Sequence, residues 1–179
     1  MKNALLISFL FLGASFSFAQ KRALNLTNAV IVSHLDKPED RFSLEIALSE
    51  AMASSGIKNT VSLNLLKQGG NPQILIQDSM TRILSEKGFN TLMLVSVRGY
   101  DKKFQSSSEN FNLQEDLAAE NLFPLYKEDI VSVTFEFHFY REGQLVYTDM
   151  IKIGGASSRE KVLRKLRKAL VKKVNKKWK

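Results

Sequence analysis

The sequence predicts a single α/β domain with one mixed sheet and helices packed on it. Short apolar runs rich in β-branched residues alternate with segments of helical periodicity in the first half of the chain. Two strand-like segments on either side of Gly143 follow in the second half, as in a β-hairpin. The expected order of elements is β-α-β-α-β-β-β-α. No linker or repeat divides the chain, so residues 20–171 are expected to form one domain.

The first nineteen residues have the features of an export signal. Lys2 precedes an apolar run from Ala4 to Phe18, which closes on the small-x-small pattern Ser17-Phe18-Ala19. A membrane anchor is the alternative, but a spanning helix needs about 20 apolar residues and this run is shorter and interrupted by serines. We therefore expect a cleaved signal peptide over residues 1–19, an exported periplasmic protein with a secreted one as the alternative, and no transmembrane segment in the mature chain.

The absence of cysteine excludes several classes of site. With no Cys in the sequence, disulfides, thiolate catalysis, Cys-ligated metals and amino-terminal lipoprotein acylation are all ruled out.

The first strand is expected at residues 29–32, an apolar run that suits a strand covered on both faces. A D-x-x-E capping arrangement of Asp36 and Glu39 around Pro38 predicts the start of the first helix, and Gly56 predicts its end. The residues expected to form its buried stripe are Phe42, Ile46 and Ala53.

Alternation over residues 61–65 predicts the second strand, with Val61, Leu63 and Leu65 on one side. Asn71 and Pro72 fit the N-cap and first position of the next helix, which Gly88 ends. The buried residues expected in that helix are Ile76, Met80, Ile83 and Leu84. Residues 91–97 form the strongest candidate for a central strand.

Residues 101–129 form a long connection with one short helix near residues 113–120. A strictly alternating strand follows, and its apolar positions are Val131, Val133, Phe135, Phe137 and Phe139. Its polar positions are Ser132, Thr134, Glu136, His138 and Tyr140, which we expect on the outer face of a half-buried hairpin; a partner surface is the alternative. The return strand covers residues 144–153, and Ser157 with Glu160 predicts the cap of the last helix.

Two segments carry a resemblance to small α/β domains of bacterial envelope proteins. They are Gly88-Phe89-Asn90 followed by Thr91-Leu92-Met93-Leu94-Val95, and Phe137-His138-Phe139-Tyr140 followed by a Gly turn and Gln144-Leu145-Val146-Tyr147. In element order and apolar pattern the chain resembles the amino-terminal domain of TolB, CsgG, LpoB and uncharacterised periplasmic relatives. The resemblance implies binding or assembly of envelope partners, and it transfers no functional residue. The chain departs from the lipoproteins among them because it lacks the acylated Cys.

One corner of the expected sheet offers a candidate catalytic site. Strand one delivers His34 and Asp36 to its carboxyl end, with Arg98, Tyr100 and Asp101 leaving the central strand nearby. A His beside a carboxylate can act as a general base, yet Asp36 is already explained as a helix cap. The two histidines, His34 and His138, have no metal-ligand spacing. We therefore expect no catalytic residue, no cofactor and no metal.

Charge is concentrated at the carboxyl terminus. Residues 159–179 hold eleven Lys and Arg against one acid, whereas residues 20–158 carry fourteen bases and seventeen acids. Val162, Leu163, Leu166, Ala169 and Leu170 share one arc of a helix, but Lys173 and Lys177 rotate back into it. Residues 172–179 are therefore expected to project past the body as a basic overhang.

The overhang is the candidate anion-docking element, and its residues are Lys172, Lys173, Lys176, Lys177, Trp178 and Lys179. Anionic lipid or cell-wall polymer, or an acidic face of an envelope protein, would be the partner; nucleic acid does not fit because no aromatic stacking platform accompanies the charge. A solvated terminus that only aids solubility is the alternative. The sequence thus favours a non-enzymatic envelope adaptor or assembly factor, with a periplasmic enzyme at the His34/Asp36 corner as the rival.

Overall fold

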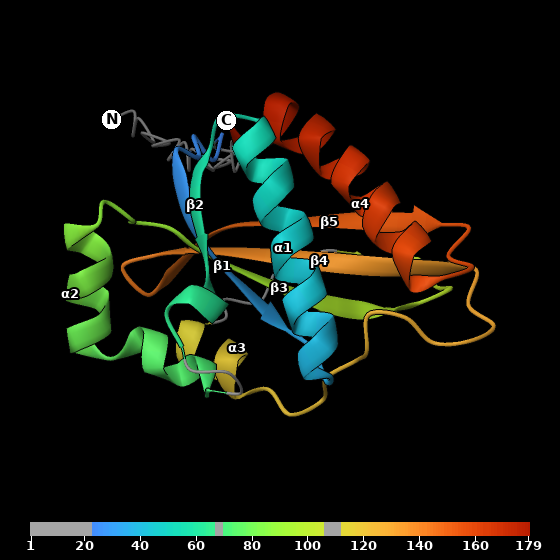
Figure 1. Ribbon diagram of the computed structural model, residues 1–179, viewed down its shortest axis with the longest axis horizontal. Coiled ribbons are helices and arrows are strands. Elements are labelled where there is room, and N and C mark those ends of the chain that lie inside the picture. The colour runs from blue at the N-terminus through green and yellow to red at the C-terminus, as the bar shows by residue number, and fades with distance from the viewer. Residues whose placement is uncertain (1–22, 67–69, 106–111) are drawn as a thin grey trace, which may run out of the picture.

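A computed structural model describes residues 23–66, 70–105 and 112–179 and shows a five-stranded mixed sheet with helices on both faces (Figure 1). The strands are β1 (Asn28–His34), β2 (Lys58–Val61), β3 (Leu92–Tyr100), β4 (Ser132–Arg141) and β5 (Gln144–Gly154). The helices are α1 (Pro38–Ser54), α2 (Asp78–Glu86), α3 (Leu113–Ala118) and α4 (Arg159–Lys173). The predicted α/β class and element order are confirmed, and α3 is the expected short helix. The expected signal peptide lies outside the described residues.

The strands lie in the order β2-β1-β3-β4-β5, so β3 is the central strand that the sequence predicted. β1 is parallel to both β2 and β3, whereas β4 is antiparallel to β3 and β5. Gly143, with φ of 75°, makes the tight β4–β5 turn at an angle that glycine adopts without strain.

The two faces of the sheet are covered by different elements. α1 and α4 pack side by side on one face (Figure 1), over an apolar core that includes the fully buried Phe135, Phe137 and Phe139 of β4. On the other face α2, α3 and a 3-10 turn (Pro72–Ile76) cover a smaller apolar cluster around Val32 and Leu94. On this second face β4 carries polar residues, and those from Glu136 to Tyr140 contribute to the site described below.

The prediction for the first helix is wrong in its buried face and in its cap. Phe42 is 56% exposed and Ile46 is 36% exposed, because a second stripe points into the core instead. The residues of that stripe are Leu44, Ala47, Leu48, Ala51 and Met52. Asp36 does not cap the helix: Lys37 is the N-cap residue, without a side-chain hydrogen bond, and Pro38 sets the start.

The second strand ends earlier than predicted because a buried carboxylate redirects the chain. Residues 62–64 form a 3-10 turn instead of continuing β2. Glu45 of α1 accepts hydrogen bonds from Ser62 Oγ (2.6 Å), from the Leu63 amide (3.3 Å) and from the Ser33 amide (2.9 Å). These bonds tie α1 to the ends of β1 and β2, a long-range contact that local alternation does not reveal.

Capping predictions have mixed outcomes. Asn71 is an N-cap as predicted and accepts from the Gln73 amide at 2.9 Å, but it caps only the 3-10 turn Pro72–Ile76. The helix expected to start there, α2, begins separately at Asp78 with Gln77 as its N-cap. The cap of α4 is Ser158 and not Ser157, and it accepts from the Lys161 amide at 3.2 Å. Ile83 was expected in the core but is 39% exposed, and Leu84 is the buried residue of α2.

The expectation of a wet outer face on β4 is wrong. Val131 lies outside the strand and is 70% exposed, while the polar residues opposite the core are buried. These residues are Ser132, Thr134, Glu136, His138 and Tyr140. The cover includes α3, so the long connection after β3 folds back over this face.

Candidate functional site

The carboxyl-terminal segment is not an overhang. α4 continues into one turn of π-helix (Val174–Trp178), which is closed by a 3.0 Å bond from the Lys179 amide to the Val174 carbonyl. The wider turn rotates the chain less per residue, so the buried face continues to the end. The fully buried positions follow at every fourth residue: Val162, Leu166, Leu170, Val174 and Trp178.

Trp178 is a core residue and is not available to a membrane. Its ring lies 5.1 Å from the ring of Phe137 and 4.9 Å from that of Phe139, centroid to centroid. Of the two residues expected to prevent packing, Lys173 is half-buried and pairs with Asp149 of β5, with Nζ 2.6 Å from Oδ1, and Lys177 is exposed. The prediction of a projecting segment was therefore wrong, because neither lysine places an unpaired charge in the core.

Three basic residues of α4 form ion pairs within the fold. Arg159 pairs with Asp40 at 2.8 Å, Arg167 with Glu50 at 2.9 Å, and Lys173 with Asp149. The first two pairs tie α4 to α1, which runs beside it in Figure 1.

Four other basic residues form a column on the exposed side of the carboxyl-terminal helix. Arg164, Lys168, Lys172 and Lys176 succeed one another at every fourth position, about 6 Å of helix rise apart. All four are exposed, and none has an acidic partner within the described part of the chain. Like charges at this spacing repel one another, so binding of an external anion would reduce the repulsion among the four side chains. We refer to these four residues as the basic ridge.

Two of the predicted docking residues, Lys172 and Lys176, belong to this ridge. Lys177 and Lys179 are also exposed, and Lys179 Nζ donates to the Ser55 carbonyl at 3.2 Å. The structure thus keeps four of the six predicted docking residues at the surface.

A second polar site lies on the opposite face of the sheet. In the strand register His34 of β1 is opposite Ser96 of β3, and Ser96 is opposite Glu136 of β4. Neighbouring residues in register share a face, so these side chains form a polar row across three strands.

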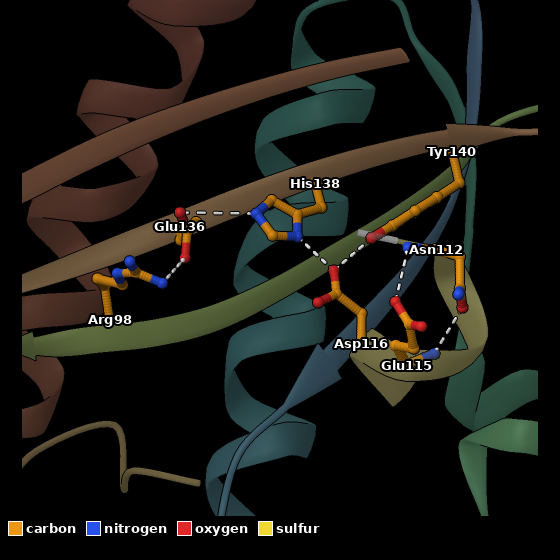
Figure 2. Close-up of polar contacts among 7 residues, drawn as sticks. All are labelled: Arg98, Asn112, Glu115, Asp116, Glu136, His138 and Tyr140. Atoms are coloured by element: carbon orange, nitrogen blue, oxygen red, sulfur yellow. Dashed lines mark hydrogen bonds and ion pairs between the residues drawn. The ribbon is translucent and has the colours of Figure 1, made fainter. Parts of the chain in front are cut away.

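The polar row continues into a cluster of five residues, Arg98, Asp116, Glu136, His138 and Tyr140, shown in Figure 2. Asp116 of α3 bonds both His138 Nδ1 and the Tyr140 hydroxyl. Glu136 accepts from Arg98 at 3.2 Å, and its other oxygen lies 3.5 Å from His138 Nε2. We refer to these residues as the polar cluster.

The polar cluster fastens α3 to the sheet. α3 begins with a capping box in which Asn112 accepts from the Glu115 amide at 2.8 Å and the Glu115 carboxylate bonds the Asn112 amide (Figure 2). The cap places Asp116 in the first turn, where it meets His138 and Tyr140 of β4.

The electrostatics of the polar cluster keep His138 charged. Burial favours its neutral form, but hydrogen bonds and charge from Asp116 and Glu136 outweigh burial and raise the pKa of His138 to about 9. Burial and the Asp116 hydrogen bond also raise the pKa of Tyr140 above its usual range. An imidazolium held between two carboxylates is a poor general base near neutral pH.

The predicted catalytic corner does not assemble as a His–Asp pair. His34 is buried, and burial, followed by the nearby charge of Arg41, lowers the pKa of His34. Asp36 is exposed, and its amide donates to the Phe123 carbonyl at 3.4 Å. Of the predicted corner, the structure brings only His34 and Arg98 into one site.

The other two corner residues hold loops. The Tyr100 hydroxyl donates to the Pro124 carbonyl at 2.5 Å, and burial with nearby acids raises the pKa of Tyr100 to about 12. Asp101 accepts from the amides of Val131 and Ser132 at 2.9 and 2.6 Å.

Sequence reasoning missed the roles of Asp116, Glu136 and His138. In the sequence Asp116 lies among the acids Glu115 and Glu120, and such a cluster usually indicates a solvated loop. The ionisable residues at alternate positions of β4 gave no signal of the site, because the same pattern is typical of a strand face open to water. Within residues 23–66, 70–105 and 112–179, no group of three His, Asp or Glu side chains is arranged to hold a metal ion. In the same ranges, each helix is too short or too polar to cross a membrane.

Comparison with known proteins finds distant structural similarity only. No family model and no curated protein matches the sequence. The lipoprotein GNA1162 from Neisseria meningitidis is similar at 11% identity and a TM-score of 0.46, covering 84% of this chain and 97% of that one. The PelC dodecamer from Paraburkholderia phytofirmans is similar at 12% identity and a TM-score of 0.43, covering 86% and 91%. A variant of that dodecamer gives 13% identity and the same score, covering 84% and 89%.

Proposed function

We propose that the protein is a non-enzymatic, exported adaptor of the cell envelope that docks on an anionic lipid surface through the basic ridge. The observation that carries the proposal is the ridge itself. Other basic residues of the same helix are engaged in ion pairs with Asp40, Glu50 and Asp149, whereas the four ridge residues remain exposed.

The packing of the last turn makes such docking more favourable than it would be for a loose tail. Because Val174 and Trp178 are buried, the helix that carries the ridge is already ordered before it meets a surface. Binding then costs little backbone entropy. Each Lys or Arg near an anionic membrane contributes about 1 kcal/mol, so the ridge could supply roughly 4 kcal/mol at low salt.

Lipid fits the ridge better than a cell-wall polymer does. The four ridge residues are all exposed along one helix, so a layer of headgroups can reach them together. A polymer chain would have to follow one line of side chains along the helix. The proposal therefore commits to lipid, and cell wall serves as a competing surface in the test.

The test is co-sedimentation with vesicles of phosphatidylglycerol and phosphatidylcholine, and with isolated cell wall, at low and physiological salt. The ridge variant changes Arg164, Lys168, Lys172 and Lys176 to Gln. A control of equal charge changes one Arg and three Lys that are exposed elsewhere: Arg82, Lys87, Lys102 and Lys103. We expect only the ridge variant to lose binding to the anionic vesicles. Equal loss in both variants, or binding to cell wall alone, contradicts the proposal.

The non-enzymatic part of the proposal is supported by the state of the two histidines. His138 is held as a cation, and His34 is apart from its expected partner Asp36. In cells, Asp36→Ala should leave the phenotype intact, because Asp36 is exposed and forms no pair with His34, while neutralising the ridge should impair function. The reverse result would favour the enzyme alternative.

A further inference from the structure

A cavity of about 300 Å³ lies beneath the segment that follows α3. Its position is the carboxyl end of the parallel strands β1 and β3, where open α/β sheets commonly bind ligands. The volume is at the lower end of the range for small-molecule sites, which is roughly 300–1,000 Å³.

The floor of the cavity is the polar row of the sheet. His34, Ser96 and Glu136 come from three neighbouring strands in register, and Arg98 and His138 flank them. These side chains offer both donors and acceptors within one small space.

The roof and walls add an apolar surface and an exposed ring. The segment after α3 contributes Ala119, Asn121, Leu122 and Phe123, and β3 adds Leu94 and Val97 at the floor. Phe123 is 41% exposed and packs edge-on against Tyr100, with ring centroids 5.8 Å apart. Phe123 thus lines the cavity and is partly exposed, so its ring can contact an apolar face of a ligand.

The charges around the cavity compensate one another. Asp116 and Glu136 oppose the charged His138 and Arg98, so the four groups sum to zero. A neutral His34 leaves that balance unchanged. Such a site gives no net attraction to a phosphate or a cation. Hydroxyl groups suit it better, because each can donate to an acid and accept from Arg or His.

We propose that this cavity binds a small, neutral, polyhydroxylated ligand of about the size of one sugar ring. The hydroxyl groups would meet the polar row, and the apolar face of the ring would lie against Phe123. The proposal is independent of docking through the basic ridge, which lies on the opposite face of the sheet.

The test is a titration of the ¹⁵N-labelled full chain followed by NMR, with glucose and N-acetylglucosamine as neutral probes and inorganic phosphate as an anionic probe. Two rim variants, Asn121→Ala and Phe123→Ala, avoid the buried cluster and so keep the fold. Val131→Ala is the matched control, because Val131 is 70% exposed and outside the cavity. Thermal unfolding verifies that all variants are folded.

We expect a neutral sugar to shift the amide signals of His34, Ser96 and Arg98. Each rim variant should weaken binding about fivefold or more, the effect of losing one hydrogen bond or one ring contact. The control should bind as the parent does.

Three results would overturn the proposal. The first is no shift with either sugar, and the second is a stronger response to phosphate. The third is a set of shifts around the apolar cavity of about 480 Å³ near Leu75, Leu84 and Phe89 instead.

Discussion

The indole N–H of Trp178 donates a hydrogen bond to Oδ2 of Asp149, 2.9 Å away. The other oxygen of the same carboxylate accepts from Lys173 Nζ at 2.6 Å. One acid of β5 therefore fixes both the penultimate residue of the chain and a lysine of α4. Shortening the chain at Leu170 would remove this anchor together with Val174, so truncation would confuse loss of docking with loss of folding.

Trp178→Ala should lower the free energy of unfolding by about 3–5 kcal/mol, because it empties a fully buried site against Phe137 and Phe139. Urea denaturation measures the change. Lys177→Ala, at the exposed neighbouring position, is the control and should change stability by less than about 0.5 kcal/mol. Equal stability of the two variants would mean that the last turn is not packed.

Glu45→Ala should cost about 3 kcal/mol, because it leaves the Ser33 amide, the Leu63 amide and the Ser62 hydroxyl without their acceptor. Glu45→Gln keeps one side-chain acceptor and should cost less. The two variants are compared by urea denaturation at neutral pH. If alanine is tolerated as well as glutamine, the carboxylate does not hold the ends of β1 and β2.

His138 should make stability depend on pH in the alkaline range. Its folded pKa of about 9 lies above the ordinary value of 6.5. The stabilisation is therefore complete below pH 6.5 and is lost as pH rises through 9, with a total of about 3 kcal/mol. Unfolding measured from pH 6 to 9.5 should show this loss in the parent and not in His138→Gln. Parallel curves for the two proteins would contradict the charged state.

The pKa values of the two histidines should be shifted in opposite directions from the ordinary value of 6.5. NMR of the imidazole protons should give His138 a midpoint near 9 and His34 a midpoint below its ordinary value. Since the chain has only these two histidines, His34→Ala assigns both signals. A midpoint for His138 at or below 6.5 would show that the carboxylates do not outweigh burial.

Local patterns predicted the strands and helices where one signal dominated. β3 was identified by its unbroken apolar run, and the turn at Asn71 and Pro72 by its cap. The buried face of α1 was harder to predict, because its apolar residues form two stripes with the same helical spacing. Burial of the Leu44 and Leu48 stripe is decided by the sheet, which the helix sequence does not describe.

The site was less accessible to sequence reasoning because its contacts are distant in the chain. The basic residues of α4 were visible as a cluster, but the pairing of Lys173 with Asp149 spans 24 residues and changes the placement of the terminus. The contact between Asp116 and His138 spans 22 residues and depends on where α3 packs on the sheet. The alternation of polar residues along β4 does not reveal that contact, because it is equally typical of a solvated face.

Docking through the basic ridge is tested most directly by the salt dependence of vesicle binding. Binding to phosphatidylglycerol vesicles is measured from low to physiological salt for the parent, for the variant with Arg164, Lys168, Lys172 and Lys176 changed to Gln, and for the control of equal charge. We expect a steep loss of binding with salt for the parent and the control, and nearly salt-independent binding for the ridge variant that is about a thousandfold weaker at low salt. Identical curves for the two variants would contradict it, because binding would then follow net charge and not the ridge.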